Sequence, residues 1–317
     1  MKTSHREPSL VVLALPGSES IAIRLAEGMH AMLGAVHFHT FPDGESYVRI
    51  DDDVAAREVV IVASLREPNE KLVNLVFLSD AARDMGATRV GLIAPYLAYL
   101  RQDTRFHPGE AITARTVAAM LSAHVDWLVT VDPHLHRFAS LAELFSIPAL
   151  NVHAGSEIGR WIGRNVAAPF IIGPDAESRQ WVERIASAAD APFTVLTKIR
   201  RGDTKVIESV PDLGEHRSCT PVLVDDIIST GHTMIAAVRQ LRAQGALPPV
   251  CVATHAVFAA DAEAQLEAAG AARVVTTNTI VHQTNAIDIV PMIAAAALVE
   301  RSMLDRASRS EPVGTGP

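Results

Sequence analysis

The sequence predicts an α/β protein with two similar domains in tandem, each a mostly parallel sheet with helices on both faces. Short apolar runs rich in Val, Ile and Leu alternate with stretches whose apolar residues recur at helical spacing, which is the pattern of repeated β-α-β units. The pattern starts again in the second half of the chain. Of the 317 residues, 49% are hydrophobic and only 5% are aromatic, so we expect an aliphatic core, as is usual in layered α/β proteins.

The first half is expected to contain strands joined by helices. The expected strands are Leu10–Leu15, Val59–Ala63, Val90–Ala94 and Trp127–Val131, and the expected helices are Ser20–Leu33, Glu70–Met85 and Thr113–Ala123. In addition, Asp43-Gly44 predicts a tight hairpin turn ahead of an alternating strand.

The second half is expected to begin after the Pro148 region with a helix near Ser156–Arg164. Its expected strands are Phe170–Ile172, Phe193–Leu196, Pro221–Val224, Val250–Thr254 and Val274–Thr277. We therefore place the domains at residues 1–148 and 149–317. The tail, residues 308–317, is rich in Ser, Gly and Pro and is expected to be disordered.

Composition argues against several classes of protein. The formal net charge is −8 and the pI is near 5.9, so the chain as a whole does not attract nucleic acid or an anionic membrane. Cys219 and Cys251 are too few for a disulfide framework or a zinc ribbon. The polar start lacks a signal-peptide core, and no apolar segment reaches the roughly 18 residues that span a bilayer. We expect a cytoplasmic enzyme with no nucleic-acid or membrane partner.

The most informative segment is the sequence between Pro221 and Met234. A short β-branched strand is followed by Asp225 and Asp226, whose ionised carboxylates can accept hydrogen bonds from the vicinal hydroxyls of a ribose. Small and hydroxyl-bearing residues then lead into a helix, where backbone amides and the helix dipole hold a phosphate. These residues are Ser229, Thr230, Gly231, His232 and Thr233. The alternative is structural, with the two acids capping a loop and the turn only starting a helix.

This segment resembles the phosphoribosyl diphosphate motif of type I phosphoribosyltransferases and of ribose-phosphate diphosphokinases. The resemblance implies two tandem type I phosphoribosyltransferase-like domains. It names a ligand class and leaves the reaction open, because both families share the motif.

Two segments of the first half favour the diphosphokinase family. The run from Phe41 to Ile50 is similar to the family's Phe-x-Asp-Gly-Glu segment, which in relatives reaches into the ATP site of a neighbouring subunit. The run from Pro95 to Asp103 is similar to Pro-Tyr-x-x-Tyr-x-Arg-Gln-Asp, and the form of Arg105–Glu110 is nearest to archaeal-type members. The ATP-binding residues that the resemblance implies are Phe41, Asp43, Glu45, Arg101, Gln102 and Asp103.

The resemblance also implies a Mg²⁺ cofactor. Asp132-Pro133-His134 matches the family's Asp-x-His, so His134 and Asp132 are the implied metal ligands, with His136 as a neighbour of the site. Asp175, in the turn Gly173-Pro174-Asp175, is a further candidate for the metal or the ribose. Two departures from the family pattern are Ala176-Glu177-Ser178, where relatives have small residues, and His232, where they usually have Gly.

Lys198 and Arg200 match the family's Lys-x-Arg pair, which supplies the catalytic positive charge from a mobile loop. The implied reaction joins ATP and ribose 5-phosphate to give phosphoribosyl diphosphate and AMP. Two alternatives remain open: a phosphoribosyltransferase, and a catalytically silent homologue that binds phosphoribosyl diphosphate or regulates an active partner. Relatives form dimers, tetramers and hexamers, so a homo-oligomer with shared active sites is implied without a fixed size.

Overall fold

The structure is a computed structural model that describes residues 9–105, 107–135, 137–201, 204–209, 213–259 and 261–310. It divides into two compact units, which we describe separately. Unit 1 contains the chain up to Val152 together with the helix that begins at Val290, and unit 2 runs from His153 to Ile289. The boundary therefore lies after Val152 rather than at residue 148, and the segment from Val290, which we expected in the second domain, packs on the first.

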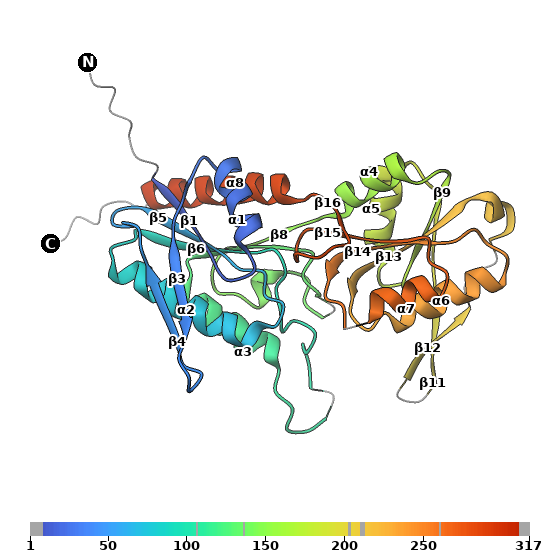
Figure 1. Ribbon diagram of the computed structural model, residues 1–317, viewed down its shortest axis with the longest axis horizontal. Helices are drawn as coiled ribbons and strands as arrows, with labels where there is room; N and C mark the ends of the chain where they lie inside the picture. The colour runs from blue at the N-terminus through green and yellow to red at the C-terminus, as the bar shows by residue number, and fades with distance from the viewer. Residues whose placement is uncertain are drawn as a thin grey trace, which may run out of the picture. The chain divides into compact units, whose positions relative to one another are not determined.

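Unit 1 is built on a six-stranded parallel sheet in the order β2-β1-β5-β6-β7-β8. Helices lie on both faces of this sheet (Figure 1). Its strands are β1 (Leu10–Ala14), β2 (Met32–Leu33), β5 (Glu58–Val62), β6 (Arg89–Ala94), β7 (Trp127–Val131) and β8 (Ala149–Val152). Its helices are α1 (Glu19–Gly28), α2 (Pro68–Asp84), α3 (Thr113–His124) and α8 (Val290–Ser310), with a short 3₁₀ turn, η1 (Leu141–Glu143). Helix α1 packs beside α8, and α2 packs beside α3. Strands β5 and β7 are wholly buried, because helices cover both faces of the sheet.

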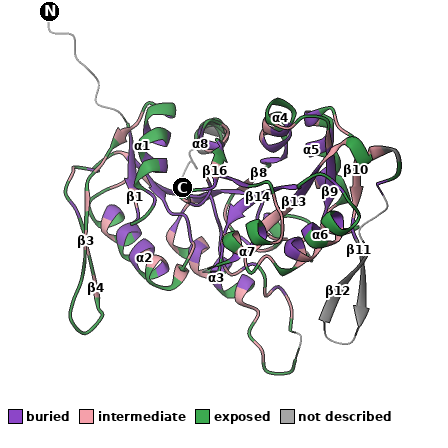
Figure 2. Cartoon of the chain, turned by 45° about the vertical axis from the view of Figure 1, so that its right-hand side comes forward, coloured by how far each residue is buried: buried purple, intermediate pink, exposed green. Residues whose placement is uncertain are grey.

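An antiparallel hairpin, β3 (Val36–Thr40) and β4 (Ser46–Ile50), projects from unit 1. One face of the hairpin packs along α2, and the other is exposed (Figure 2). The hairpin turn expected at Asp43-Gly44 is confirmed. The amide of Gly44 donates to the Phe41 carbonyl oxygen at 2.9 Å, and the Phe41 amide donates to the Glu45 carbonyl oxygen at 2.8 Å.

Unit 2 repeats this plan with a parallel sheet in the order β10-β9-β13-β14-β15-β16. Its strands are β9 (Pro169–Gly173), β10 (Phe193–Val195), β13 (Thr220–Ile228), β14 (Val250–Ala256), β15 (Arg273–Thr277) and β16 (Asn285–Ile287). Its helices are α4 (Gly155–Asn165), α5 (Arg179–Ala189), α6 (His232–Ala243) and α7 (Ala262–Ala268), with the 3₁₀ turn η2 (Gly214–Ser218). The hairpin β11 (Thr197–Arg201) and β12 (Thr204–Ser209) stands at the same point of the strand sequence as β3 and β4. The expected pair of mostly parallel α/β domains is confirmed.

The ends of two helices differ from those expected. The helix expected to reach Leu33 ends at Gly28, and the chain then forms the edge strand β2. Residues 308–310, expected to be part of a disordered tail, form the end of α8, and residues 311–317 lie outside the described part of the chain.

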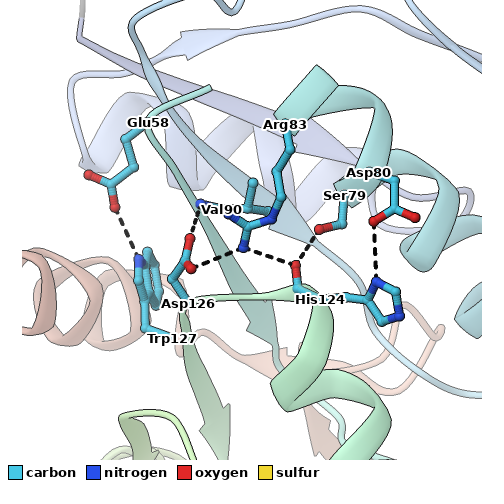
Figure 3. Close-up of polar contacts among 8 residues, drawn as sticks. All are labelled: Glu58, Ser79, Asp80, Arg83, Val90, His124, Asp126 and Trp127. Carbon is cyan, nitrogen blue, oxygen red and sulfur yellow. Dashed lines mark hydrogen bonds and ion pairs between the residues drawn. The ribbon is translucent and has the colours of Figure 1, made fainter. Parts of the chain in front are cut away.

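The amino ends of the central strands of unit 1 are closed by polar side chains that pair with one another (Figure 3). The Trp127 indole donates to the Glu58 carboxylate at 3.0 Å. The Asp126 carboxylate accepts the Val90 amide at 2.7 Å and the Arg83 guanidinium at 3.0 Å. These contacts stabilise the amino edge, and they leave the opposite, carboxyl edge as the place where ligands bind in open α/β sheets.

Candidate functional site

A small cavity of about 10 Å³, room for a single water molecule, lies near the carboxyl edge of the unit 2 sheet. Its wall includes Gly173 at the end of β9 and Pro174 after it, Asp225 on β13, and Thr233 and Met234 in the first turn of α6. Three segments that the sequence singled out as separate motifs therefore meet at one place. The remaining lining is aliphatic and comes mainly from β9, β13 and α6.

The turn between β13 and α6 has the geometry that the phosphate-loop prediction requires. Gly231 precedes the first residue of α6 and has φ +69°, a left-handed conformation that glycine adopts without a steric penalty. Its carbonyl oxygen accepts the amide of Ile235 at 2.8 Å, which starts the helix. His232 and Thr230 are exposed, and Ser229 and Thr233 are partly buried. The loop therefore presents hydroxyl groups at the positive end of a 12-residue helix.

Asp225 and Asp226 belong to the strand itself, because β13 continues to Ile228 beyond the expected end at Val224. Asp225 pairs in register with Ala253 of β14, and its carboxylate accepts the Asp226 amide at 2.9 Å. Both residues are partly exposed where the sheet ends, so their carboxylates can meet a ligand without complete loss of solvation.

The turn after β9 is well ordered in spite of its departure from the family pattern. The Ser178 amide donates to the Asp175 carboxylate at 3.1 Å, and the Ser178 hydroxyl donates to the Asp175 carbonyl oxygen at 2.7 Å. Ser178 thus closes a compact turn ahead of α5, while Glu177 is exposed. At Gly173 a β-carbon would lie 2.4 Å from Val182 Cγ2, so the close approach of α5 to β9 requires glycine.

The predicted nucleotide residues lie in two parts of unit 1. Phe41, Asp43 and Glu45 are exposed at the tip of the β3–β4 hairpin, where the Asp43 carboxylate accepts the Glu45 amide at 3.1 Å. Arg101, Gln102 and Asp103 follow β6 at the carboxyl edge. Arg101 is exposed, and Asp103 is buried with its carboxylate 3.5 Å from the Arg137 guanidinium. Phe106 lies outside the described residues.

The predicted metal ligands are divided between the units. Asp132 follows β7 in unit 1, is buried, and has φ +33°, and His134 is partly buried two residues later. Asp175 is in unit 2, and His136 lies outside the described residues. Within the described residues, no three His, Cys, Asp or Glu side chains gather into a group that could hold a metal ion.

Lys198 and Arg200 lie on β11, one of the two strands of a hairpin. Lys198 is in register with Ile207 and Arg200 with Lys205. Alternate residues of a strand share a face, so the backbone places the two on one side of the hairpin. The side chains of both residues lie outside the described part of the chain.

Sequence reasoning missed a buried polar cluster at the carboxyl ends of β14 and β15. His255 Nδ1 lies 2.9 Å from the Thr279 hydroxyl, and both residues are buried. The hydroxyls of Thr277 and Thr279 donate to the Thr254 carbonyl oxygen at 2.6 and 3.0 Å. The sequence did contain a signal for this cluster. Thr254 and His255 follow an apolar run, as Asp225 and Asp226 do.

This cluster supports the strand that leads into the loop from Ser229 to Thr233. Ile227 of β13 pairs in register with His255 of β14. Just beyond β14, the Ala259 amide donates to the Ser229 carbonyl oxygen at 3.1 Å. The loop is therefore attached to its neighbour in the sheet on the side away from β9.

Among the residues that the structure describes, none of the helices combines the length and the hydrophobicity needed to cross a bilayer.

Comparison with known proteins covers nearly the whole chain. Residues 10–124 match the family model for the N-terminal domain of ribose phosphate pyrophosphokinase, and residues 149–289 match that for a phosphoribosyl transferase domain. A ribose-phosphate pyrophosphokinase of Methanopyrus kandleri is 38% identical over 290 residues, which are 90% of this chain and 98% of the relative. One from Sulfurisphaera tokodaii is 32% identical over 91% of this chain and 99% of the relative. A crystal structure of phosphoribosylpyrophosphate synthetase from Mycobacterium smegmatis superimposes with a TM-score of 0.79 at 27% identity, covering 92% of this chain and 99% of the other.

Proposed function

The chain belongs to the ribose-phosphate pyrophosphokinase family, and from this premise we propose that it transfers the diphosphoryl group of ATP to the C1 hydroxyl of ribose 5-phosphate. The products are 5-phosphoribosyl 1-diphosphate and AMP. The observation that carries the proposal is that Gly173, Asp225 and Thr233, from three separate sequence motifs, come together around one small cavity near the carboxyl edge of the unit 2 sheet.

The pentose phosphate binds in unit 2 under this proposal. Asp225 and Asp226 accept hydrogen bonds from the ribose hydroxyls, since both are partly exposed at the end of β13. The 5-phosphate rests on the loop from Ser229 to Thr233, where the loop amides and the dipole of α6 favour an anion. Gly231 supports this role, because its left-handed backbone forms the turn without a side chain in the way.

The nucleotide binds through unit 1. Arg101 provides a planar fork of donors for a phosphate or the adenine, and Gln102 can read a base edge. The exposed aromatic ring of Phe41 is suited to stacking on a base, and its position at a hairpin tip supports a contribution to the site of a second copy of the chain. We therefore propose a homo-oligomer with shared active sites.

The donor groups at both carboxyl edges fit Mg²⁺, which prefers oxygen ligands and keeps several waters. Asp132, Asp175, Asp225 and Asp226 supply carboxylates, with His134 as a minority ligand. Fewer than three of these gather in either unit among the described residues, which fits an ion held largely by substrate phosphates. When bound, magnesium would supply positive charge that polarises the phosphate being attacked. Lys198 and Arg200 add positive charge to the same group, so no protein nucleophile is needed.

Incubation of the purified chain with ATP, Mg²⁺ and ribose 5-phosphate tests the proposal, with AMP and phosphoribosyl diphosphate as the expected products. Lys198→Ala and Arg200→Ala should each lower kcat by about 10²–10³-fold while the affinity for ribose 5-phosphate stays close to that of the wild type. Release of AMP by both variants at the wild-type rate would remove their catalytic role. Phosphoribosyl transfer to a nucleobase, or tight binding of phosphoribosyl diphosphate without AMP formation, would identify the transferase or the silent homologue instead.

A further inference from the structure

The segment that follows β6 contains a tyrosine in an unusual backbone conformation. Tyr99 has φ +66°, in the left-handed region, which is rare for a bulky residue and persists only where the surrounding structure holds it. Tyr99 stands two residues before Arg101 and three before Gln102, the residues assigned to the nucleotide. Such a conformation at the edge of a binding site indicates a functional constraint, provided that specific contacts maintain it.

Contacts from two helices hold Tyr99. Its hydroxyl group donates a hydrogen bond to the Asn69 side-chain oxygen in the first turn of α2. Its carbonyl oxygen accepts a hydrogen bond from the Thr113 hydroxyl at the start of α3, at 3.1 Å. The side chain of Tyr99 is thus bonded to α2 and its backbone to α3. Together the two hydrogen bonds hold the residue in its left-handed conformation.

The neighbouring residues are fixed as well. The Leu65 amide, ahead of α2, donates to the Tyr96 carbonyl oxygen at 2.9 Å. The Ala114 amide in α3 donates to the Gln102 carbonyl oxygen at 3.3 Å. Leu100 is buried, and Arg101 is exposed directly after it. The backbone is therefore held on both sides of Arg101, while the guanidinium reaches solvent at the carboxyl edge of the sheet.

We infer that Tyr99 and Asn69 are positioning residues for the nucleotide, fixing the turn that directs Arg101 and Gln102 toward ATP. The inference rests on the proposed function. A rotation of φ at residue 99 changes the direction of the chain immediately before Arg101. Displacement of a binding group by about 1 Å can cost as much as about 10²-fold in rate. Asn69 and Tyr99 thus link the first turn of α2 to the nucleotide segment, although neither has to contact ATP.

Steady-state kinetics of Tyr99→Phe and Asn69→Ala in the full chain test the inference. Tyr99→Phe removes one hydroxyl group and keeps the ring. We expect each variant to raise the KM for ATP by about 5–20-fold, the range that follows from the loss of one hydrogen bond and of the turn it fixes. The KM for ribose 5-phosphate should change less than twofold, because that substrate is assigned to unit 2. The double variant should raise the KM for ATP by no more than the larger of the two single changes does, because both changes break the same hydrogen bond.

Two further variants complete the experiment. Thr113→Val removes the contact to the Tyr99 carbonyl oxygen without altering Tyr99 or Asn69, so it should raise the KM for ATP in the same selective way. Asn165→Ala is the matched control. Asn165 also uses its side chain for one exposed hydrogen bond, to the Trp161 carbonyl oxygen at 2.8 Å, but it lies in unit 2, and Asn165→Ala should leave both KM values unchanged. Calorimetric titration with a nonhydrolysable ATP analogue should report the same selective loss.

The possible outcomes separate this inference from the proposed function. A wild-type chain that releases no AMP from ATP and ribose 5-phosphate contradicts the proposed function. An active wild type whose Tyr99→Phe and Thr113→Val variants keep the wild-type KM for ATP overturns the positioning role alone. A parallel rise of both KM values, or a fall in kcat with neither KM changed, would mean a general structural loss and would overturn it as well.

Discussion

Cys251 is an example of a residue whose chemistry is set by burial alone. It is the second residue of β14 and has no exposed surface, and burial raises the pKa of its thiol to about 12. The thiolate is the reactive form, so Cys251 stays protonated and inert at pH 8. Cys219 is partly exposed just ahead of β13. We expect a thiol reagent to modify one cysteine per native chain at pH 8 and two in denaturant. Cys219→Ser should abolish the native reaction, and rapid modification of two thiols in the folded chain would contradict the assignment.

The types of residue in the sequence predicted where polar groups lie in the fold, but they did not predict the backbone conformation of those residues. Asp225, Gly231 and Thr233 could be placed because each follows an apolar strand, and strand ends of a parallel sheet meet at one edge. The left-handed conformations of Tyr99 and Asp132 could not be predicted. They depend on contacts that are remote in sequence, such as the hydrogen bond from Tyr99 to Asn69.

The packing of β6 against β7 depends on one glycine. A β-carbon at Gly91 would lie 2.1 Å from Trp127 Cε2, and the indole cannot move away because Glu58 holds its nitrogen at 3.0 Å. Gly91→Ala should therefore lower the free energy of unfolding by about 1–3 kcal/mol. Denaturant titration measures this change. Gly155→Ala is the control. Its β-carbon would lie no closer than 3.5 Å to a neighbouring atom, so the free energy of unfolding should change little. Equal stability of the two variants would contradict the packing argument.

Elements with a strong pattern were predictable, and those with a weak pattern were not. The central strands and the β3–β4 hairpin follow from apolar runs and from Asp43-Gly44. The sequence analysis did not predict helix α8, because the apolar residues of this helix are distributed around its whole circumference. Ala294 and Ala297 are buried, while Val299 and Met303 are about half exposed, so no single apolar stripe marks it.

The two halves of the chain share one architecture, which the recurring sequence pattern had indicated. Each has six parallel strands in the same order and a hairpin inserted at the same point. The assignment of the last helix was not predictable from this symmetry. Helix α4 follows the sheet of unit 1 but belongs to unit 2, and α8 follows the sheet of unit 2 but belongs to unit 1. Each unit is completed by a helix that follows the sheet of the other unit in the chain, so unit 1 depends on a segment that comes after all of unit 2 in the sequence.

The attachment of α8 to unit 1 depends on a buried carboxylate. Glu58 is 7% exposed and accepts the Arg301 guanidinium of α8 at 2.9 Å, with Arg89 at 3.6 Å. Arg301→Met keeps most of the aliphatic contact but leaves Glu58 poorly compensated, which should lower the free energy of unfolding of unit 1 by about 1–3 kcal/mol. Hydrogen exchange should become faster in α8, β5 and β7 and stay unchanged in β13 and β14.

Arg306→Met is the matched control for this prediction, because Arg306 lies on the same helix with an exposed side chain. It removes the same charge from α8 without affecting Glu58, so its exchange profile should equal that of the wild type. Faster exchange in unit 2 in the Arg301 variant, or the same change in both variants, would show that α8 is held by general helix charge and not by Glu58. Selective loss of protection in unit 1 would establish that α8 is an integral part of the first α/β unit.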